Sequence, residues 1–128
     1  MSTRVLLCDD SGVILTLLEK RLKDIGYEVV GKAKDGNECI TKYKMLKPDL
    51  LLLDITMPNK DGRECLEELM LLDPKAKIVM VSAVLDEEVQ RSCLEAGAKA
   101  FINKGNISSI DDFKNKVLPI IQPIILAA

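Results

Sequence analysis

The chain has 128 residues, 48% of them hydrophobic and 30% charged, and its formal net charge is -2. This size and composition are typical of a single globular domain with an aliphatic core, which leaves no room for a second domain and disfavours global disorder. The 18 basic residues form no basic cluster and are outnumbered by 20 acidic ones, so direct binding to nucleic acid is disfavoured.

The two ends of the chain predict neither a secretion signal nor a membrane span. The apolar stretch near the N-terminus is too short for a signal peptide and runs at once into Asp9 and Asp10. The apolar stretch from about residue 119 is shorter than the ~20 residues of a spanning helix and contains two prolines. Four scattered cysteines and no histidine favour reduced, mostly buried thiols over a zinc site. We therefore expect a cytoplasmic protein without membrane insertion.

Five short apolar runs alternate along the chain with longer segments of helical periodicity. The runs, which we interpret as strands, cover residues 4–8, 28–33, 49–54, 77–83 and 100–104. A first helix is predicted between Ser11, a favourable N-cap residue, and Gly26, which stops a helix. A second is predicted over residues 36–46, because residues before a proline such as Pro48 avoid helical dihedrals. The third begins at residue 61 or 62 and the fourth covers residues 86–96.

A fifth helix is predicted to begin near Ser108 or Ser109 and to be interrupted by two prolines. Because a proline inside a helix removes a hydrogen bond and costs ~3 kcal/mol, Pro119 and Pro123 predict a kink or an end near Leu118. The isoleucines beyond that point either stay exposed, as a surface for a partner or for dimerisation, or fold back on the core.

The apolar runs predict a parallel sheet. Residues 4–8, 49–54 and 77–83 are apolar without alternation, as in strands that helices bury on both faces. Right-handed connections then bring the carboxyl ends of all strands to one edge of the sheet, where ligands bind in such folds. We therefore predict an α/β fold with a doubly wound, five-stranded parallel sheet and helices on both of its faces.

A polar residue follows the apolar run at four of the predicted strand ends. Asp9 and Asp10 follow the first strand, Asp54 the third, Ser82 the fourth and Lys104 the fifth. Converging carboxylates would raise one another's pKa values unless a cation neutralised them, and an all-oxygen site with room for water suits Mg²⁺. Any one of these residues alone is more simply a helix cap or a solvent-facing side chain. Together they favour phosphoryl transfer to a carboxylate.

At these residues the chain resembles the receiver domain of two-component response regulators, over about residues 3–118. The matching motifs are CDDS (8–11), LLLLDITMPNKDG (50–62), VSA (81–83) and FINK (101–104). The resemblance implies a flavodoxin-like sheet in the order 2-1-3-4-5 and a single receiver domain over residues 1–128, with a short apolar C-terminal tail from about residue 119. It also implies a phosphorylation-dependent signalling switch that catalyses only its own phosphorylation and dephosphorylation. Stretches such as DPKAKIVMVSA look like those of stand-alone chemotaxis receivers, although receiver domains of longer regulators contain similar sequences.

The resemblance also implies how the site works. Asp54 is the phosphoacceptor for a histidine kinase. Asp10 and Asp54 bind Mg²⁺ (or Mn²⁺) directly, Thr56 binds it through its backbone carbonyl, and Asp9 binds it through water. Lys104 pairs with Asp54 and then with the phosphoryl group.

Two further positions are implied to form the switch. The hydroxyl of Ser82 moves towards the phosphoryl group and the ring of Phe101 turns inward, so that a downstream protein recognises the face made by the fourth helix, the fifth strand and the fifth helix. Phospho-lifetime in the family depends on the residues here numbered Thr56 and Val84. Because an apolar Val84 cannot position an attacking water, we expect slow self-dephosphorylation. The protein is expected to be a monomer or a weak dimer.

The chain departs from the family pattern after Lys104. The family commonly has a proline there, in a cis peptide bond, and this chain has Gly105. Because a cis bond before a non-proline residue costs ~2.5 to 4 kcal/mol, we predict a trans bond. We also expect a more mobile loop and a less firmly placed Lys104.

Two other classes of protein fit the same residues less well. The haloacid-dehalogenase phosphatases also use Mg²⁺ and a strand-end aspartate but need a second acid two residues on, where this chain has Thr56. Dinucleotide-binding folds need a glycine-rich first turn, and the turn CDDSGV is instead acidic. A receiver-like module that works unphosphorylated stays open because of Gly105, as does the receiver part of a longer regulator.

Overall fold

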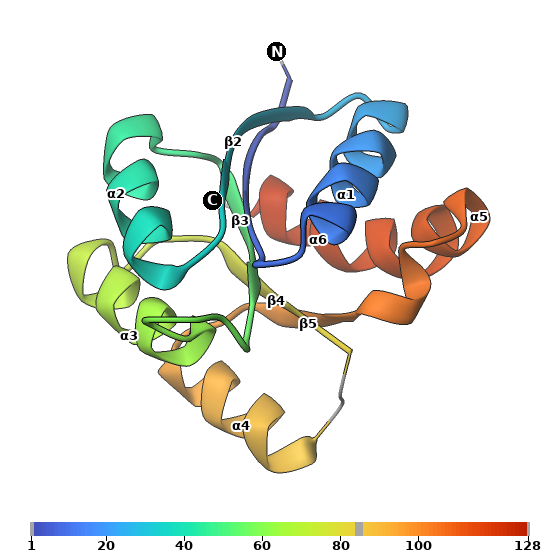
Figure 1. Ribbon diagram of the computed structural model, residues 1–128. Coiled ribbons are helices and arrows are strands. Elements are labelled where there is room, and N and C mark those ends of the chain that lie inside the picture. The colour runs from blue at the N-terminus through green and yellow to red at the C-terminus, as the bar shows by residue number, and fades with distance from the viewer. Residues whose placement is uncertain (1, 84–85, 128) are drawn as a thin grey trace.

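The computed structural model describes residues 2–83 and 86–127. Its strands are β1 (Arg4–Cys8), β2 (Glu28–Ala33), β3 (Leu50–Asp54), β4 (Ile78–Ser82) and β5 (Ala100–Asn103). They pair in parallel to form one sheet in the order β2-β1-β3-β4-β5 (Figure 1). This confirms the expected fold class and strand order, and the observed strand boundaries lie within one residue of the expected ones.

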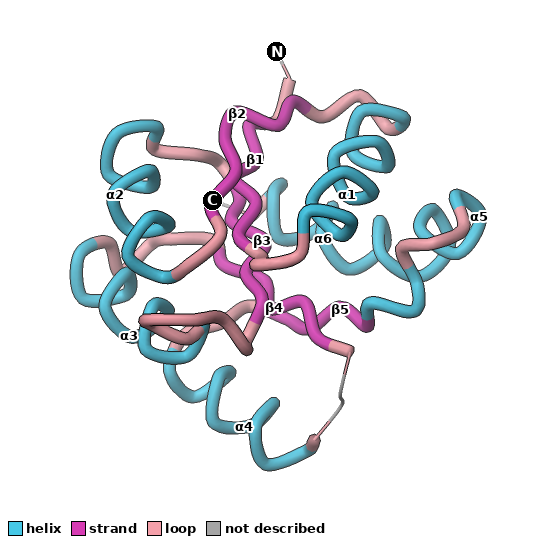
Figure 2. Tube along the Cα trace, viewed as in Figure 1, coloured by secondary structure: helices cyan, strands magenta, loops and turns pink. Residues whose placement is uncertain are grey.

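Helices cover both faces of this sheet (Figure 2). One layer contains α2 (Gly36–Leu46), α3 (Gly62–Leu72) and α4 (Glu87–Ala96), and the other contains α1 (Gly12–Asp24), α5 (Ile110–Asp112) and α6 (Leu118–Leu126). Side-chain N-caps fix where the helices start: Ser11 Oγ accepts a hydrogen bond from the amide of Ile14 at α1, and Asp61 accepts one from Glu64 at α3. Among the described residues, no helix combines the length and the apolar character that crossing a membrane requires.

The run of four leucines in β3 forms the centre of the core. All five residues of β3 and of β4 are buried, because helices pack on both faces of these central strands. The two edge strands are less buried; four of the six residues of β2 are only partly covered. Burying apolar surface stabilises a fold by about 25 cal/mol per Å², so the fully buried strand β3 is a firm support for Asp54, its last residue.

All four cysteines are buried and free, as expected. Cys8 and Cys65 donate their thiol hydrogens to two successive carbonyls, those of Asp35 (3.6 Å) and Gly36 (3.7 Å). Thiols buried in this way behave as small apolar side chains.

The C-terminal helix is irregular where the prolines predict it to be, yet it does not end there. The segment η2 (Phe113–Val117) is a π-helical stretch, in which the amide of Leu118 donates to the carbonyl of Phe113. The chain then continues as α6, because Pro119 stands in the first turn of α6, where its missing amide costs little.

The apolar tail folds back on the core rather than staying exposed. Ile121 is fully buried, and Ile124 and Ile125 pack against the α1 side of the sheet. The ammonium of Lys77 donates to the carbonyls of Ile125 (3.0 Å) and Ala127 (2.6 Å), which holds the C-terminal end of α6. Of the two alternatives for the isoleucines, the structure therefore has the second.

Candidate functional site

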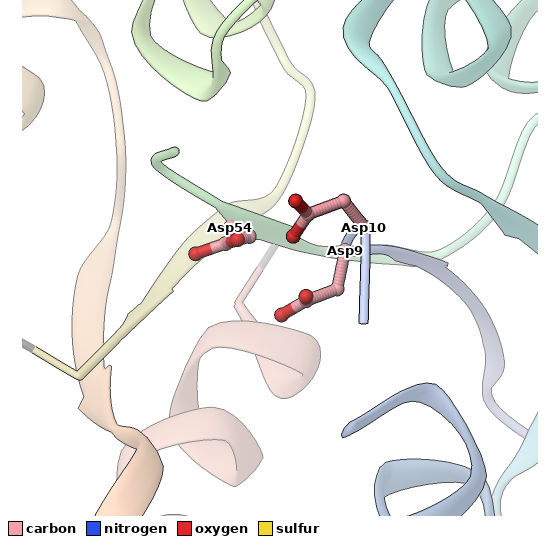
Figure 3. A group of neighbouring side chains, drawn as sticks. All are labelled: Asp9, Asp10 and Asp54. Carbon is pink, nitrogen blue, oxygen red and sulfur yellow. The ribbon is translucent and has the colours of Figure 1, made fainter. Parts of the chain in front are cut away.

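Three aspartates meet at the carboxyl edge of the sheet. Asp9 and Asp10 follow β1, and Asp54 ends β3, the strand beside β1. Their carboxylate oxygens, one from each residue, all lie within 4.8 Å of one another (Figure 3). Asp9 and Asp54 are buried whereas Asp10 is exposed. The convergence expected from the strand order is thus confirmed, with one solvent-facing carboxylate.

Lys104 connects two of these aspartates. Its ammonium lies 2.8 Å from Asp9 Oδ2 and 3.2 Å from Asp54 Oδ1. Lys104 follows β5, two strands away from β3, and its long side chain crosses the end of β4 to reach them. The sequence predicted the contact with Asp54; the shorter contact with Asp9 was not anticipated.

The charges of this group are only partly balanced. Burial raises the pKa of Asp54 above its ordinary value and the Asp9 carboxylate raises it further, while the Lys104 ammonium opposes both. Burial lowers the pKa of Lys104, but the two carboxylates outweigh this and the pKa of Lys104 is raised. One ammonium therefore does not fully compensate two buried carboxylates, and the site favours a further cation.

The donor set fits a hard divalent cation. Asp9 Oδ1 accepts a hydrogen bond from the amide of Ser11 (2.9 Å), whereas Asp9 Oδ2 is buried and its only polar partner among the described residues is the Lys104 ammonium. Its remaining lone pair, together with the carboxylates of Asp54 and exposed Asp10, offers oxygen ligands only. A site with few protein ligands and an open side for water suits Mg²⁺.

The loop after β3 is held against the site by Gly62, a residue whose role sequence reasoning missed. The amide of Gly62 donates to the carbonyl of Ile55 (2.7 Å), and a Cβ at this position would overlap the carbonyl oxygen of Asp54. From the sequence, the pair Asp61-Gly62 predicts only the start of a helix. A tight return of the chain onto Asp54 is what requires the glycine.

The other predicted site residues lie around this group. Ser82 ends β4 and is buried, one residue beyond the position paired with Asp54. Phe101, in β5, is partly buried against the core on the side of α2, α3 and α4. Thr56 is exposed in the loop after β3. Val84 lies outside the described residues. The metal contact of Thr56 and the switch roles of Ser82 and Phe101 stay predictions.

The loop after Lys104 is closed by hydrogen bonds. Every described peptide bond is trans, as predicted for Lys104-Gly105. Residues Lys104–Asn106 form a 3₁₀ turn, η1, in which the amide of Ile107 donates to the carbonyl of Lys104 (3.3 Å). Asn103 Oδ1 accepts the amide of Gly105 (2.8 Å). Sequence reasoning did not anticipate these bonds, which restrain the backbone that carries Lys104.

Replacing Asp54 with asparagine is expected to stabilise the metal-free protein at neutral pH by about 1 kcal/mol, because it removes an incompletely compensated buried charge. The pKa of Asp54 is raised by folding, so the cost of its charge is absent at low pH and grows as pH rises above about 3.9, the ordinary aspartate pKa. Urea unfolding in a chelator, at acidic and at neutral pH, measures this gain. A gain that did not diminish on acidification would contradict the assignment to the charge.

The chain is similar in sequence and in structure to known proteins. The family model of the response regulator receiver domain matches residues 5–116. The chemotaxis protein CheY of Thermotoga maritima is 42% identical over 104 residues, which are 81% of this chain and 87% of that protein. The response regulator domain of Thermotoga maritima CheB has a TM-score of 0.88 at 32% identity, covering 100% of this chain and 99% of that chain. The CheX-CheY-BeF3-Mg²⁺ complex of Borrelia burgdorferi has a TM-score of 0.84 at 33% identity, covering 93% and 89%.

Proposed function

Because the chain belongs to the family of response regulator receiver domains, we propose that it is a phosphorylation-dependent signalling switch in chemotaxis. It accepts a phosphoryl group from a histidine kinase on Asp54 and passes the signal on by protein–protein contacts in the cytoplasm. The observation that carries this proposal is the Lys104 ammonium between buried Asp9 and Asp54, beside the exposed carboxylate of Asp10.

The chemistry proposed is transfer to a carboxylate. An Asp54 oxygen attacks the phosphorus of a phosphohistidine, the new O–P bond forms as the P–N bond breaks, and the electron pair of the broken bond returns to the imidazole nitrogen. Lys104 donates to the oxygens of the arriving group, and Asp9 holds Lys104 in place. The protein catalyses only this transfer and the later hydrolysis of the aspartyl phosphate, in which water attacks the phosphorus, inorganic phosphate leaves and the Asp54 carboxylate is regained.

A divalent cation completes the site in this proposal. Asp10, Asp54 and the Thr56 carbonyl would hold Mg²⁺ or Mn²⁺, and Asp9 would join through water. The bound cation supplies positive charge to the oxygens of the transferring group. Exposed Asp10 leaves the open side through which a phosphodonor and water enter.

The proposed switch couples the phosphoryl group to a distant surface. The Ser82 hydroxyl and the Phe101 ring shift together, and the face made by α4, β5 and the last helix (α5, η2 and α6) changes its affinity for a downstream protein. Phosphorylation biases this equilibrium only by the difference between its contacts in the two states. A related protein from Borrelia burgdorferi forms a complex with CheX; a partner for this chain is proposed on the same basis, with residues 1–128 acting as one receiver domain.

Phosphoryl uptake is the decisive test. We expect incubation with a small acyl-phosphate donor and Mg²⁺ to add one phosphoryl group, seen by intact mass, and a chelator to prevent it. Asp54→Asn should take up none. Asp49→Asn is the control, because Asp49 lies at the other end of the leucine run of residues 50–53, and it should match the wild type. If the wild-type protein stays unmodified, the alternative of a receiver-like module that works unphosphorylated is favoured.

Slow self-dephosphorylation is expected from the apolar Val84. Because phospho-lifetime in the family depends on this position, a polar side chain in Val84→Glu or Val84→Asn is expected to accelerate the decay. The decay of the phosphorylated mass after removal of the donor measures this. Decay rates equal to that of the wild-type protein in both variants would count against the role of this position.

A further inference from the structure

Arg21, on α1, binds the loop that follows Lys104. Its Nε donates to the carbonyl of Ile107 (3.0 Å) and its Nη2 to the carbonyl of Ser108 (2.7 Å). The side chain of Arg21 is only 12% exposed, and the carboxylate of Asp24 lies 3.7 Å from Nη1. A mostly buried guanidinium with two loop carbonyls as its partners is a specific contact rather than a solvent-facing charge.

The contact of Arg21 is one turn away from the lysine that enters the site. The amide of Ile107 donates to the carbonyl of Lys104 (3.3 Å), so the same residue receives Arg21 on one side and closes the Lys104 turn on the other. The Ile107 side chain is fully buried. Arg21 and Ile107 together restrain the end of the turn, while Asn103 Oδ1 restrains its start.

The turn has a particular need for such restraint. Gly105 stands directly after Lys104, and glycine has more backbone freedom than any other residue. The carbonyls at the end of a short 3₁₀ turn have no partner within it. A guanidinium presents a fixed fork of donors that matches two successive carbonyls, which a lysine ammonium does not.

We propose that Arg21 is a positioning residue for phosphoryl transfer. By holding the carbonyls of Ile107 and Ser108, it fixes the backbone from which Lys104 reaches Asp9 and Asp54. Among the described residues, Arg21 pairs with the carboxylate of Asp24, whereas the carboxylates of Asp9 and Asp54 pair with Lys104. This inference rests on the proposed phosphorylation of Asp54, and it supplies the restraint that a proline after Lys104 would otherwise give.

The test compares two arginines that each donate to a backbone carbonyl. Arg21→Met should slow phosphorylation by a small acyl phosphate about tenfold, since a modest displacement of a charge-stabilising group has effects of this order. Arg4→Met is the matched control, because Arg4 donates to the carbonyl of Lys47 (3.0 Å) through a contact outside the site. It should keep the wild-type rate. Arg21→Lys, with a single ammonium, should fall between the wild type and Arg21→Met.

A double-mutant cycle separates positioning from general destabilisation. If Arg21 acts through Lys104, then Arg21→Met should cause no further loss of rate in a Lys104→Ala background. An additive loss in that background, or a wild-type rate in Arg21→Met, would overturn the inference. If Arg21→Met fails to fold, the folded Arg21→Lys variant decides in the same background.

These outcomes differ from a failure of the proposed function itself. In that case the wild-type protein and the Arg4→Met control would also take up no phosphoryl group. If the wild-type protein takes up a phosphoryl group and Arg21→Met does so at the same rate, Asp54 is still the acceptor, and only the positioning role of Arg21 is refuted.

Discussion

Replacing Lys104 with alanine is expected to lower the free energy of unfolding of the metal-free protein by about 3 kcal/mol at neutral pH. The substitution leaves the buried carboxylates of Asp9 and Asp54 facing each other without the ammonium now 2.8 Å and 3.2 Å from them. Their repulsion and burial then destabilise the fold. Urea unfolding in a chelator measures the loss.

The loss should depend on pH in both directions. Folding raises the pKa of Lys104, so its contribution is complete below about 10.4, the ordinary lysine pKa, and is lost as pH rises through the raised value. On the acidic side, the pKa of Asp54 is raised already and rises further without the ammonium, so protonation restores stability as pH falls. The difference between variant and wild type is therefore largest between these limits.

Saturating Mg²⁺ should recover part of the stability lost in Lys104→Ala, because a bound cation replaces the missing positive charge. Lys99→Ala is a suitable control. Lys99 is the lysine that comes before Lys104 in the chain, and it precedes β5, at the end of the strand opposite to the site. A Lys104→Ala variant whose stability responded neither to Mg²⁺ nor to acid would show that the two carboxylates are not the cause.

Replacing Gly62 with alanine is expected to lower the free energy of unfolding by about 3 kcal/mol and to abolish phosphoryl uptake. The added methyl group would overlap the carbonyl of Asp54 and press on the backbone of Ile55, neither of which is a flexible side chain. The end of β3 or the start of α3 must then move. Urea unfolding and intact mass after acyl-phosphate treatment measure the two effects.

Gly12→Ala provides the matched control for the Gly62 variant. The nearest atom to a Cβ at Gly12 is the Lys34 ammonium at 3.8 Å, which is ordinary contact. This variant should keep its phosphoryl uptake and be as stable as the wild type, or more stable by up to about 1 kcal/mol, because alanine has less freedom in the unfolded chain. Equal effects in both variants would contradict the close packing of Gly62 on Asp54.

The parts of the site on strand ends could be predicted from the sequence because parallel strands place their ends together. An unbroken apolar run such as residues 50–53 has few alternatives to a buried central strand, so Asp54 and Asp9 had to converge once the strand order was known. The resemblance to the receiver family supplied that order. Lys104 followed by the same reasoning.

The parts that escaped prediction depend on the path of loops. Arg21 is 86 residues from Ile107 along the chain, and no periodicity links a helix residue to a distant carbonyl. Gly62 was identified as a helix start, but its approach to Asp54 follows from how the loop returns to the strand. The prolines of the last helix predicted an irregularity, whereas tertiary packing of Ile121 decided that the chain continues as a helix.

The four buried cysteine thiols can report on local opening of the fold, because a buried thiol becomes accessible to an alkylating reagent only when the structure around it opens. They lie on β1, α2, α3 and α4, and Cys8 directly precedes Asp9. Burial raises the pKa of Cys93, and hydrogen bonds between Cys39 and its neighbours Cys65 and Cys8, together with burial, raise the pKa of Cys39, so these two thiols carry little reactive thiolate in the closed protein. The rate of alkylation in native buffer consequently reports how often the layer of α2, α3 and α4 separates from the sheet. Opening of this layer can thus be followed, with and without a phosphodonor, in the unlabelled wild-type chain.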